Sequence, residues 1–232
     1  MSLYLPTSLQ QPFHGVLFDL DGTLIDSEGL HYAAFKQALL EHGYDLDSLG
    51  DTIQYGGSFR KMFLAIAERF HLPDNTFETI YERKVEITLA TPVSAVDILD
   101  GVTSFLELLK ERNVPTGLVT NSEQAYVDHV LNGFDLAQYF DHIVHAEHVA
   151  EPKPAPDGYL RGIELMQLPA SGILAFENTD AGITAARTAG LKVIAIHSTD
   201  PLGTSTYEEA HLSVDHFGDS ALDDLLFESQ AK

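Results

Sequence analysis

Residues 16–24 read VLFDLDGTL, and this stretch decides how the rest of the chain is interpreted. The apolar run that leads to Asp19 is short, as is typical of a buried parallel strand. It ends in two carboxylates, Asp19 and Asp21, which are followed by a glycine and a hydroxyl side chain. In extended backbone, side chains two positions apart face the same side, so these two acids would repel each other. Either a cation lies between them or one of them carries a proton.

The segment after this strand, residues 28–96, has the residue spacing of helices alone. Apolar side chains recur three and four positions apart in three stretches, and these stretches stop at Gly43, Pro73 and Pro92. Each stretch would bury one face of a helix. The sequence therefore predicts a small helical bundle whose apolar faces form its own core.

From residue 97 onward, predicted strands alternate with predicted helices. The strands are 116–120, 142–146, 172–177 and 192–196, and the helices are 102–112, 123–132, 156–166, a segment ending at Gly190, and a closing helix over 219–227. Such alternation predicts a doubly wound α/β fold with a parallel sheet. We expect a core of residues 1–25 and 95–232, with residues 26–94 inserted as a helical cap. Ligands of such sheets bind beyond the carboxyl ends of the strands, so the cap would cover the site as a lid.

Composition limits the possible partners and compartments. The 232 residues include 35 acidic and 13 basic side chains, for a formal charge of −22. This charge would repel nucleic acid and anionic membranes, so we expect neither as a partner. The chain has no cysteine, which excludes disulfides, thiolate nucleophiles and cysteine zinc sites. No apolar run reaches the roughly 18 residues of a membrane span, and the start lacks the pattern of a signal peptide. We expect a cytoplasmic protein and a monomer.

Polar side chains follow the predicted strands at the points where the strands end. Because these ends meet at one edge of a parallel sheet, the side chains would converge. A threonine after a strand is also typical of a helix cap, and a lone lysine is usually solvated. Together, however, carboxylates, a hydroxyl and an ammonium group are what a site needs to hold a phosphate and a divalent cation. The set comprises Asp19, Asp21, Thr120, Asn121, Ser122, Lys153, Glu177, Asn178 and Asp180.

Four motifs carry a resemblance to a known family. They are DLDGTL (19–24), TN (120–121), KPAPD (153–157) and FENTDAGITAARTAG (176–190), in that order. The chain resembles the haloacid dehalogenase superfamily from residue 14 to about 200, in the phosphatase branch with a small helical, C1-type cap. The subgroup that it resembles contains β-phosphoglucomutase-like proteins and sugar-phosphate phosphatases. The resemblance implies a Rossmann-like core, a mobile cap, a Mg²⁺ cofactor and an aspartyl-phosphate intermediate.

The resemblance also implies a role for individual residues. Asp19 matches the nucleophile, whose other oxygen binds Mg²⁺, and Asp21 matches the general acid and base, whose main-chain carbonyl binds the metal. Thr120 and Asn121 match the substrate-binding motif, in which the threonine hydroxyl contacts the phosphoryl group, and Lys153 matches the cation that neutralises it. On this interpretation the metal keeps Asp19 ionised while Asp21 can carry the proton. The second aspartate also favours phosphate chemistry over dehalogenation.

One position departs from the family pattern. The last motif usually contains a Glu-Asp pair in which the aspartate binds Mg²⁺, but here it reads Glu177-Asn178. An amide oxygen is still a hard ligand, although a negative charge has been lost. Glu177 would help to hold the metal through a water, whereas Asp180 has no counterpart as a ligand. We therefore expect Mg²⁺ to bind through Asp19, Asp21, Glu177 and Asn178, and more weakly than in the family. Impaired catalysis, or a protein that binds phosphate without turning it over, stays open.

The leading interpretation is a Mg²⁺-dependent phosphatase that acts on a small phosphorylated metabolite such as a sugar phosphate. The alternative is a sugar-phosphate mutase, whose cap loop carries a cation for a second phosphate. In the matching stretch YGGSFRK (55–61), Arg60 and Lys61 lie one or two places away from that position. A phospho-acceptor switch is disfavoured, because such proteins are about half as long and lack a lid.

The histidines of the chain leave two further questions. His31 matches a hinge histidine of the mutase-like relatives, so it either approaches the active site or serves as a packed or capping residue. His142, His145 and His148 are spaced by three, and on a strand this spacing points successive rings to opposite faces. A zinc site built from them is therefore disfavoured.

Overall fold

The computed structural model of the chain describes residues 9, 13–48, 59–73, 76–197 and 205–222. The side chains of residues 59–62, and with them Arg60 and Lys61, lie outside this description. Most of the closing helix predicted over 219–227 lies outside it too. No helix among the described residues is long and apolar enough to cross a membrane.

The described residues form one parallel sheet of six strands. Its order is β3-β2-β1-β4-β5-β6, and each neighbouring pair runs parallel, so all carboxyl ends lie at the same edge. β1 occupies the interior, where Phe18 lies opposite Leu118 on one side and Phe176 on the other. The strands are β1 (Gly15–Phe18), β2 (Thr116–Val119), β3 (His142–Val144), β4 (Ile173–Glu177), β5 (Lys192–Ile196) and β6 (Leu212–Val214).

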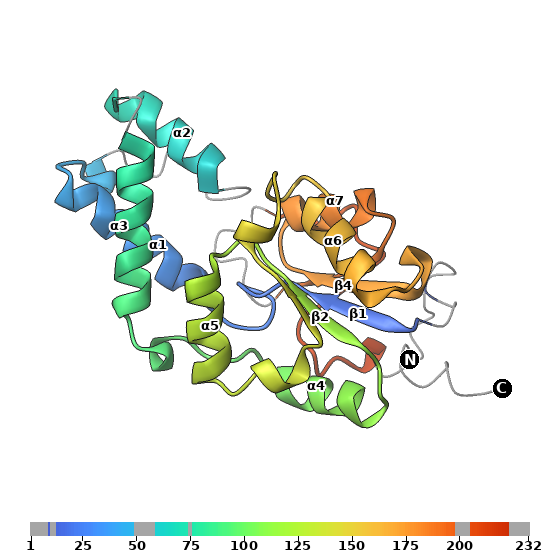
Figure 1. The fold of residues 1–232 in the computed structure, drawn as a ribbon. Coiled ribbons are helices and arrows are strands. Elements are labelled where there is room, and N and C mark those ends of the chain that lie inside the picture. The colour runs from blue at the N-terminus through green and yellow to red at the C-terminus, as the bar shows by residue number, and fades with distance from the viewer. Residues whose placement is uncertain (1–8, 10–12, 49–58, 74–75, 198–204, 223–232) are drawn as a thin grey trace.

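Helices cover both faces of this sheet, as Figure 1 shows, which confirms the predicted doubly wound, Rossmann-like fold. α4 (Val102–Glu111) and α5 (Gln124–Gly133) lie on one face, and α6 (Asp157–Met166) and α7 (Asp180–Thr188) lie on the other. Alternation along β1 supplies both cores: Val16 and Phe18 join one apolar cluster with Phe105, and Leu17 joins the second with Tyr159. The sequence of β1 is continuously apolar because both of its faces are buried.

The segment inserted after β1 folds as three helices with a core of their own. α1 (Glu28–Glu41), α2 (Phe59–Phe70) and α3 (Thr76–Ala90) stand apart from the sheet in Figure 1. Phe35 from α1, Ile66 from α2 and Ile80 from α3 are fully buried in one cluster, as the apolar spacing predicted. We propose that residues 26–94 move as the cap and that 1–25 and 95–232 form the core.

The two segments that join the bundle to the sheet run side by side. Ile25 pairs with Ile98 in an antiparallel bridge. The amide of Asp26 donates to the carbonyl of Asp97 at 2.9 Å, and the amide of Leu99 donates to the carbonyl of Leu24 at 3.0 Å. The chain therefore leaves the core and returns to it at one place.

Two of the predicted strands after residue 97 end earlier than their apolar runs suggested, two end where predicted, and one strand was missed. β2 ends at Val119 and β3 at Val144, because the chain turns toward the site at Thr120 and forms a 3₁₀ turn at Ala146–His148. β6 was not predicted because it has three residues and no long apolar run. It forms at the sheet edge through pairing with β5.

Candidate active site

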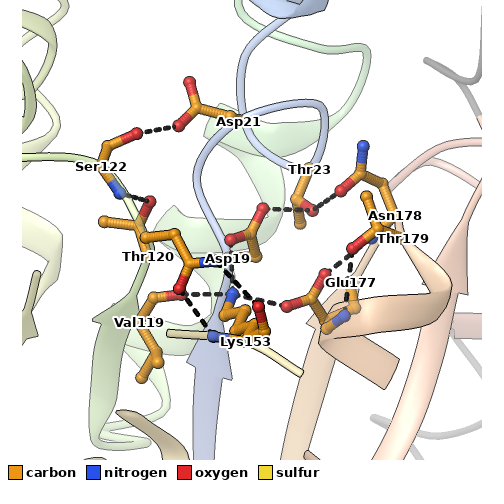
Figure 2. A network of polar contacts seen from close by, with 12 residues as sticks. Asp19, Asp21, Thr23, Val119, Thr120, Ser122, Lys153, Glu177, Asn178 and Thr179 are labelled. Carbon is orange, nitrogen blue, oxygen red and sulfur yellow. Dashed lines mark hydrogen bonds and ion pairs between the residues drawn. The ribbon is translucent and has the colours of Figure 1, made fainter. Parts of the chain in front are cut away.

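The side chains predicted to converge do lie together at the carboxyl edge of the sheet. Asp19 follows β1, Thr120 follows β2 and Glu177 is the last residue of β4. Lys153 reaches the same place from the loop before α6 (Figure 2). The order of the strands thus assembles one cluster from residues that are more than 150 positions apart.

Lys153 links two buried carboxylates. Its Nζ atom donates to Asp19 Oδ1 at 2.6 Å, to Glu177 Oε1 at 2.5 Å and to the carbonyl oxygen of Val119 at 2.8 Å. Its main-chain amide donates to the amide oxygen of Asn121 at 3.0 Å, which fixes the loop that carries the lysine. Asn121 therefore supports Lys153 in this structure.

The charges in this cluster do not balance. Burial, and then the charge of Glu177, raise the pKa of Asp19 to about 8, although Lys153 opposes the rise. Burial lowers the pKa of Lys153, but the two carboxylates outweigh burial and raise it. Two buried acids thus share one ammonium group, so ionisation of both acids would leave one negative charge without a counterion beside Asp19. A cation bound there would correct the deficit.

The charge of Asp21 raises the pKa of Asp19, as the expected repulsion between the two acids requires, but Asp21 is not the main cause. Glu177 raises the pKa of Asp19 more than Asp21 does. The physical reason is that β1 ends at Phe18, so the alternation of an extended strand no longer fixes the two side chains. Asp19 turns toward Lys153, whereas Asp21 turns toward serine hydroxyls and a histidine.

Asp21 accepts three hydrogen bonds in a separate part of the site. Its Oδ1 atom accepts from the Ser27 hydroxyl at 2.6 Å and contacts His31 Nε2 at 2.9 Å, while Oδ2 accepts from the Ser122 hydroxyl at 2.6 Å. Burial raises the pKa of this carboxyl, but His31 and the two serines outweigh burial and hold it well below its usual range. His31 belongs to α1, so a helix of the inserted bundle reaches the site.

Glu177 is completely buried, and its carboxylate accepts hydrogen bonds from three residues. Besides Lys153, its carboxylate accepts from the Tyr159 hydroxyl at 2.7 Å and from the main-chain amide of Asn178 at 3.2 Å. The first turn of α7 leaves room for it, because a β-carbon on Gly182 would lie 2.0 Å from the carboxyl carbon of Glu177. A glycine is therefore required at position 182 if Glu177 is to keep its place.

Thr23, Asn178 and Thr120 complete the polar cluster (Figure 2). The Thr23 hydroxyl lies 3.2 Å from Asp19 Oδ2 and 3.4 Å from the amide oxygen of Asn178, so these two oxygens face a common point. The Thr120 hydroxyl accepts from the amide of Ser122 at 3.0 Å. Thr120 thus makes the cap-like contact that its position after a strand also suggested.

The remaining candidates of the sequence lie outside this cluster. Asp180 accepts from the amides of Thr206 and Tyr207 at 2.9–3.2 Å and so tethers that segment. The ring centroids of His145 and His148 lie 3.6 Å apart, with the ring planes tilted by 33°, because a 3₁₀ turn brings positions three apart together. Within the described ranges, no group of three or more His, Cys, Asp or Glu side chains could hold a metal ion.

Several contributors could not be found from the sequence motifs. Ser27 reaches Asp21 from the start of the inserted segment, and Tyr159 reaches Glu177 from α6. His31 was named from its match to a hinge histidine, and its contact with Asp21 selects the first of the two roles left open for it. Neither serines nor tyrosines have a distinctive spacing here, and their roles depend on contacts between elements. The position of Lys153 opposite Glu177 could not be predicted for the same reason.

The fold and the site define a class: a doubly wound α/β enzyme with acidic residues and a buried lysine beyond its interior strand. A family model described as haloacid dehalogenase-like hydrolase matches residues 16–196. The chain belongs to this family and is therefore a hydrolase. The match runs through every strand of the sheet except β6 and through most of the described site, and it begins one residue into β1.

Relatives and solved structures agree with this assignment. The fructose-1-phosphate phosphatase YqaB of Escherichia coli is 29% identical over 190 residues, which cover 81% of this chain and 98% of that protein. The phosphorylated carbohydrates phosphatase of Thermotoga maritima is 26% identical over 193 residues, which cover 79% and 85%. The structure of a HAD hydrolase from Entamoeba histolytica has a TM-score of 0.78 at 24% identity and covers 94% of this chain and all of that one. At this identity the structural likeness shows the fold.

Proposed function

We propose that this protein is a Mg²⁺-dependent phosphatase that hydrolyses a small phosphorylated metabolite, of the sugar-phosphate class, through an aspartyl-phosphate intermediate. The observation that carries the proposal is the placement of Asp19. Its carboxylate lies at the end of an interior strand and 2.6 Å from the buried ammonium group of Lys153. The relatives named as sugar-phosphate and carbohydrate phosphatases support the substrate class.

The proposed reaction has two steps. A carboxylate oxygen of Asp19 attacks phosphorus, the bond from phosphorus to the ester oxygen breaks, and the leaving oxygen takes a proton from Asp21. Water then attacks phosphorus and gives a proton to Asp21. The bond from phosphorus to Asp19 breaks, which releases inorganic phosphate and restores the carboxylate. Covalent catalysis divides one difficult hydrolysis into two easier transfers.

Asp21 must alternate between two protonation states in this scheme. Its three present contacts favour the carboxylate. A serine hydroxyl can donate or accept, so Ser27 or Ser122 can turn and accept a hydrogen bond when Asp21 carries the proton. The surroundings of Asp21 thus suit the base as they stand, and they suit the acid once one of the two serines has turned.

The residues beside Asp19 fit a hard cation. Asp19 Oδ2 and the amide oxygen of Asn178 both lie within hydrogen-bond distance of the Thr23 hydroxyl, and a cation would favour ionisation of Asp19 beside Glu177. We propose that these two oxygens and the main-chain carbonyl of Asp21 hold Mg²⁺, which suits oxygen ligands and few carboxylates. When bound, Mg²⁺ supplies charge that neutralises the phosphoryl oxygens. Glu177, whose oxygens are already engaged, would act mainly by orienting Lys153.

Release of inorganic phosphate from a panel of phosphorylated metabolites and a generic aryl phosphate tests the proposal. We expect turnover of sugar monophosphates by the native protein and less than a few per cent of it in Asp19→Asn, because an amide cannot act as the nucleophile. Asp21→Asn should slow turnover about 10²–10⁴-fold, the usual value of acid–base assistance. Full activity of Asp19→Asn would exclude the mechanism. Interconversion of sugar phosphates without phosphate release would identify a mutase instead.

A further inference from the structure

Tyr159, in the first turn of α6, contacts two members of the cluster around Asp19. Its hydroxyl donates to Glu177 Oε1 at 2.7 Å, and the Nζ atom of Lys153 lies 5.0 Å from the centroid of its ring. The side chain is fully buried. A carboxylate gains from a phenol donor, and an ammonium group gains from an aromatic face within about 6 Å. One side chain therefore holds both Lys153 and the acid that Lys153 contacts.

The place of Tyr159 is set by the close approach of α6 to the sheet. A β-carbon on Gly158 would lie 2.9 Å from Val119 Cγ1, and one on Gly162 would lie 2.9 Å from Leu17 Cδ1, both too near for ordinary contact. Tyr159 directly follows the first of these glycines and packs in the same apolar cluster as Leu17 and Val119. Its hydroxyl therefore reaches the site from a helix that is packed firmly against β1 and β2.

Packing explains the ring of Tyr159 but not its oxygen. Phenylalanine would fill the same space in the apolar cluster. The oxygen matters to Glu177, whose Oε1 atom accepts from Tyr159 and, at 2.5 Å, from Lys153. The same ammonium group donates to Asp19 Oδ1 at 2.6 Å. Two acids thus compete for one ammonium group, and the phenol supplies one of them with a second donor.

We propose that Tyr159 is a positioning residue that acts through Glu177 to keep Lys153 aimed at Asp19. This inference rests on the proposed function, because it presupposes that Asp19 is the nucleophile. Without the phenol oxygen, Lys153 would be the remaining donor to Glu177 Oε1 in the described part of the chain. The ammonium group would then move toward Glu177 and away from Asp19, and the nucleophile would lose its alignment.

Steady-state kinetics of Tyr159→Phe with a sugar monophosphate at saturating MgCl₂ test the inference. The variant keeps the ring beside Lys153 and removes only the oxygen. We expect kcat and kcat/KM to fall by the same factor, with KM unchanged, because alignment of the nucleophile counts in the transition state rather than in binding. The expected factor is about tenfold to hundredfold, the value of one hydrogen bond to a charged group.

Met166→Val is the matched control for a loss of packing. Met166 lies about two turns further along α6, is 8% exposed and belongs to the same apolar cluster as Tyr159. A smaller side chain there should lower the free energy of unfolding by an amount comparable to that in Tyr159→Phe, but leave kcat and KM within about twofold of the native values. Urea denaturation at the assay temperature shows that both variants are folded.

Three results would overturn the inference. One is an unchanged kcat in Tyr159→Phe. Another is a rise of KM that accounts for the whole fall of kcat/KM, which would assign the hydroxyl to binding. The third is an equal fall of kcat in Met166→Val, which would mean that any loosening of α6 disturbs the site. Failure of the proposed function looks different: the native protein would release no phosphate, or Asp19→Asn would retain activity.

Discussion

Lys153 has its hydrogen atoms fully engaged in this structure. An ammonium group has three hydrogens, and Asp19, Glu177 and the carbonyl of Val119 accept from it. A phosphoryl oxygen can gain a hydrogen bond from Lys153 only when one of these contacts is released. In the proposed mechanism, phosphorylation of Asp19 would neutralise the carboxylate that Lys153 contacts, which makes this the contact that is easiest to give up. Lys153 is thus suited first to aim the nucleophile and then to hold the transferred group.

The amide at Asn178 should weaken metal binding. A full charge is missing from the proposed ligand set, and two unit charges about 4 Å apart interact by roughly 4 kcal/mol at an effective dielectric near 20. Solvation offsets part of this loss. We expect Asn178→Asp to tighten Mg²⁺ binding about tenfold to hundredfold, measured by calorimetric titration and by the rise of the thermal midpoint with Mg²⁺.

Asp180→Asn is the control for this experiment, because Asp180 is bound to the amides of Thr206 and Tyr207. Removal of the negative charge at position 180 should leave the Mg²⁺ affinity nearly unchanged. An unchanged affinity in Asn178→Asp would show that this amide does not hold the metal.

Gly182 should be intolerant of even a methyl group. The β-carbon of an alanine would lie 2.0 Å from the buried carboxyl carbon of Glu177, which has no free direction in which to move. We expect Gly182→Ala to lower the free energy of unfolding by about 1–3 kcal/mol, as overpacking does, and to reduce activity as well. Urea denaturation measures the first effect.

Gly29→Ala provides a contrast, since a β-carbon at this position in α1 meets no atom within 4 Å. It should be neutral or stabilise the protein by up to about 1 kcal/mol through helix propensity. Equal stability of the two alanine variants would contradict the packing described around Glu177.

At the scale of elements, α3 and α5 hold the bundle against the core. The Tyr81 hydroxyl of α3 donates to the carboxylate of Glu123, the residue just before α5. Tyr81 also stacks on Phe77, with ring centroids 5.6 Å apart and nearly parallel planes, so the ring is held independently of its hydroxyl. This hydrogen bond, named the clasp below, therefore joins the inserted bundle to the core.

Tyr81→Phe should loosen this clasp while keeping the stacked ring. The loss of one hydrogen bond corresponds to about a twofold to tenfold change in an opening equilibrium. We expect faster hydrogen exchange at the linkers, residues 24–26 and 97–99, with unchanged exchange in β1 and β4. Exchange at the linkers that equals that of the native protein would show that the clasp does not restrain the cap.

The elements that carry the site were largely predictable, and their contacts were not. Apolar runs that end in Asp19, Thr120 and Glu177 identify strands of a parallel sheet, whose carboxyl ends necessarily meet. Nothing in the spacing indicates that Lys153 lies between Asp19 and Glu177, and the match of His31 to a hinge histidine did not decide between an active-site role and a packing role. Those pairings depend on how loops and helices pack across the sheet edge. β6 escaped prediction because three residues give no periodic signal.

For the whole molecule, the charge of −22 is the dominant electrostatic feature. Like charges spread over a compact chain repel each other, and salt screens this repulsion. We expect the thermal midpoint to rise by about 2–4 °C between roughly 20 mM and 500 mM NaCl, which for a protein of this size corresponds to about 1 kcal/mol. Differential scanning calorimetry measures the change.

MgCl₂ at matched ionic strength separates screening from specific binding. In Asp19→Asn, which lacks the proposed anionic metal ligand, the two salts should act alike. In the native protein, MgCl₂ should raise the thermal midpoint further than NaCl does. A midpoint that falls with NaCl would mean that attractive ion pairs outweigh the net repulsion.

The side-by-side linkers at Ile25 and Ile98 have a consequence for the ancestry of such a protein. An insertion whose two ends meet can be lengthened, exchanged or removed during recombination, because a short turn suffices to rejoin the chain. The sheet and the cluster of Asp19, Lys153 and Glu177 would stay intact through such an event, whereas the contacts of Ser27 and His31 with Asp21 would have to be kept or replaced. The cap and the catalytic residues of the sheet can therefore be inherited separately. One lineage can acquire a new cap, and with it a different substrate range, while it keeps the catalytic residues at the edge of the sheet.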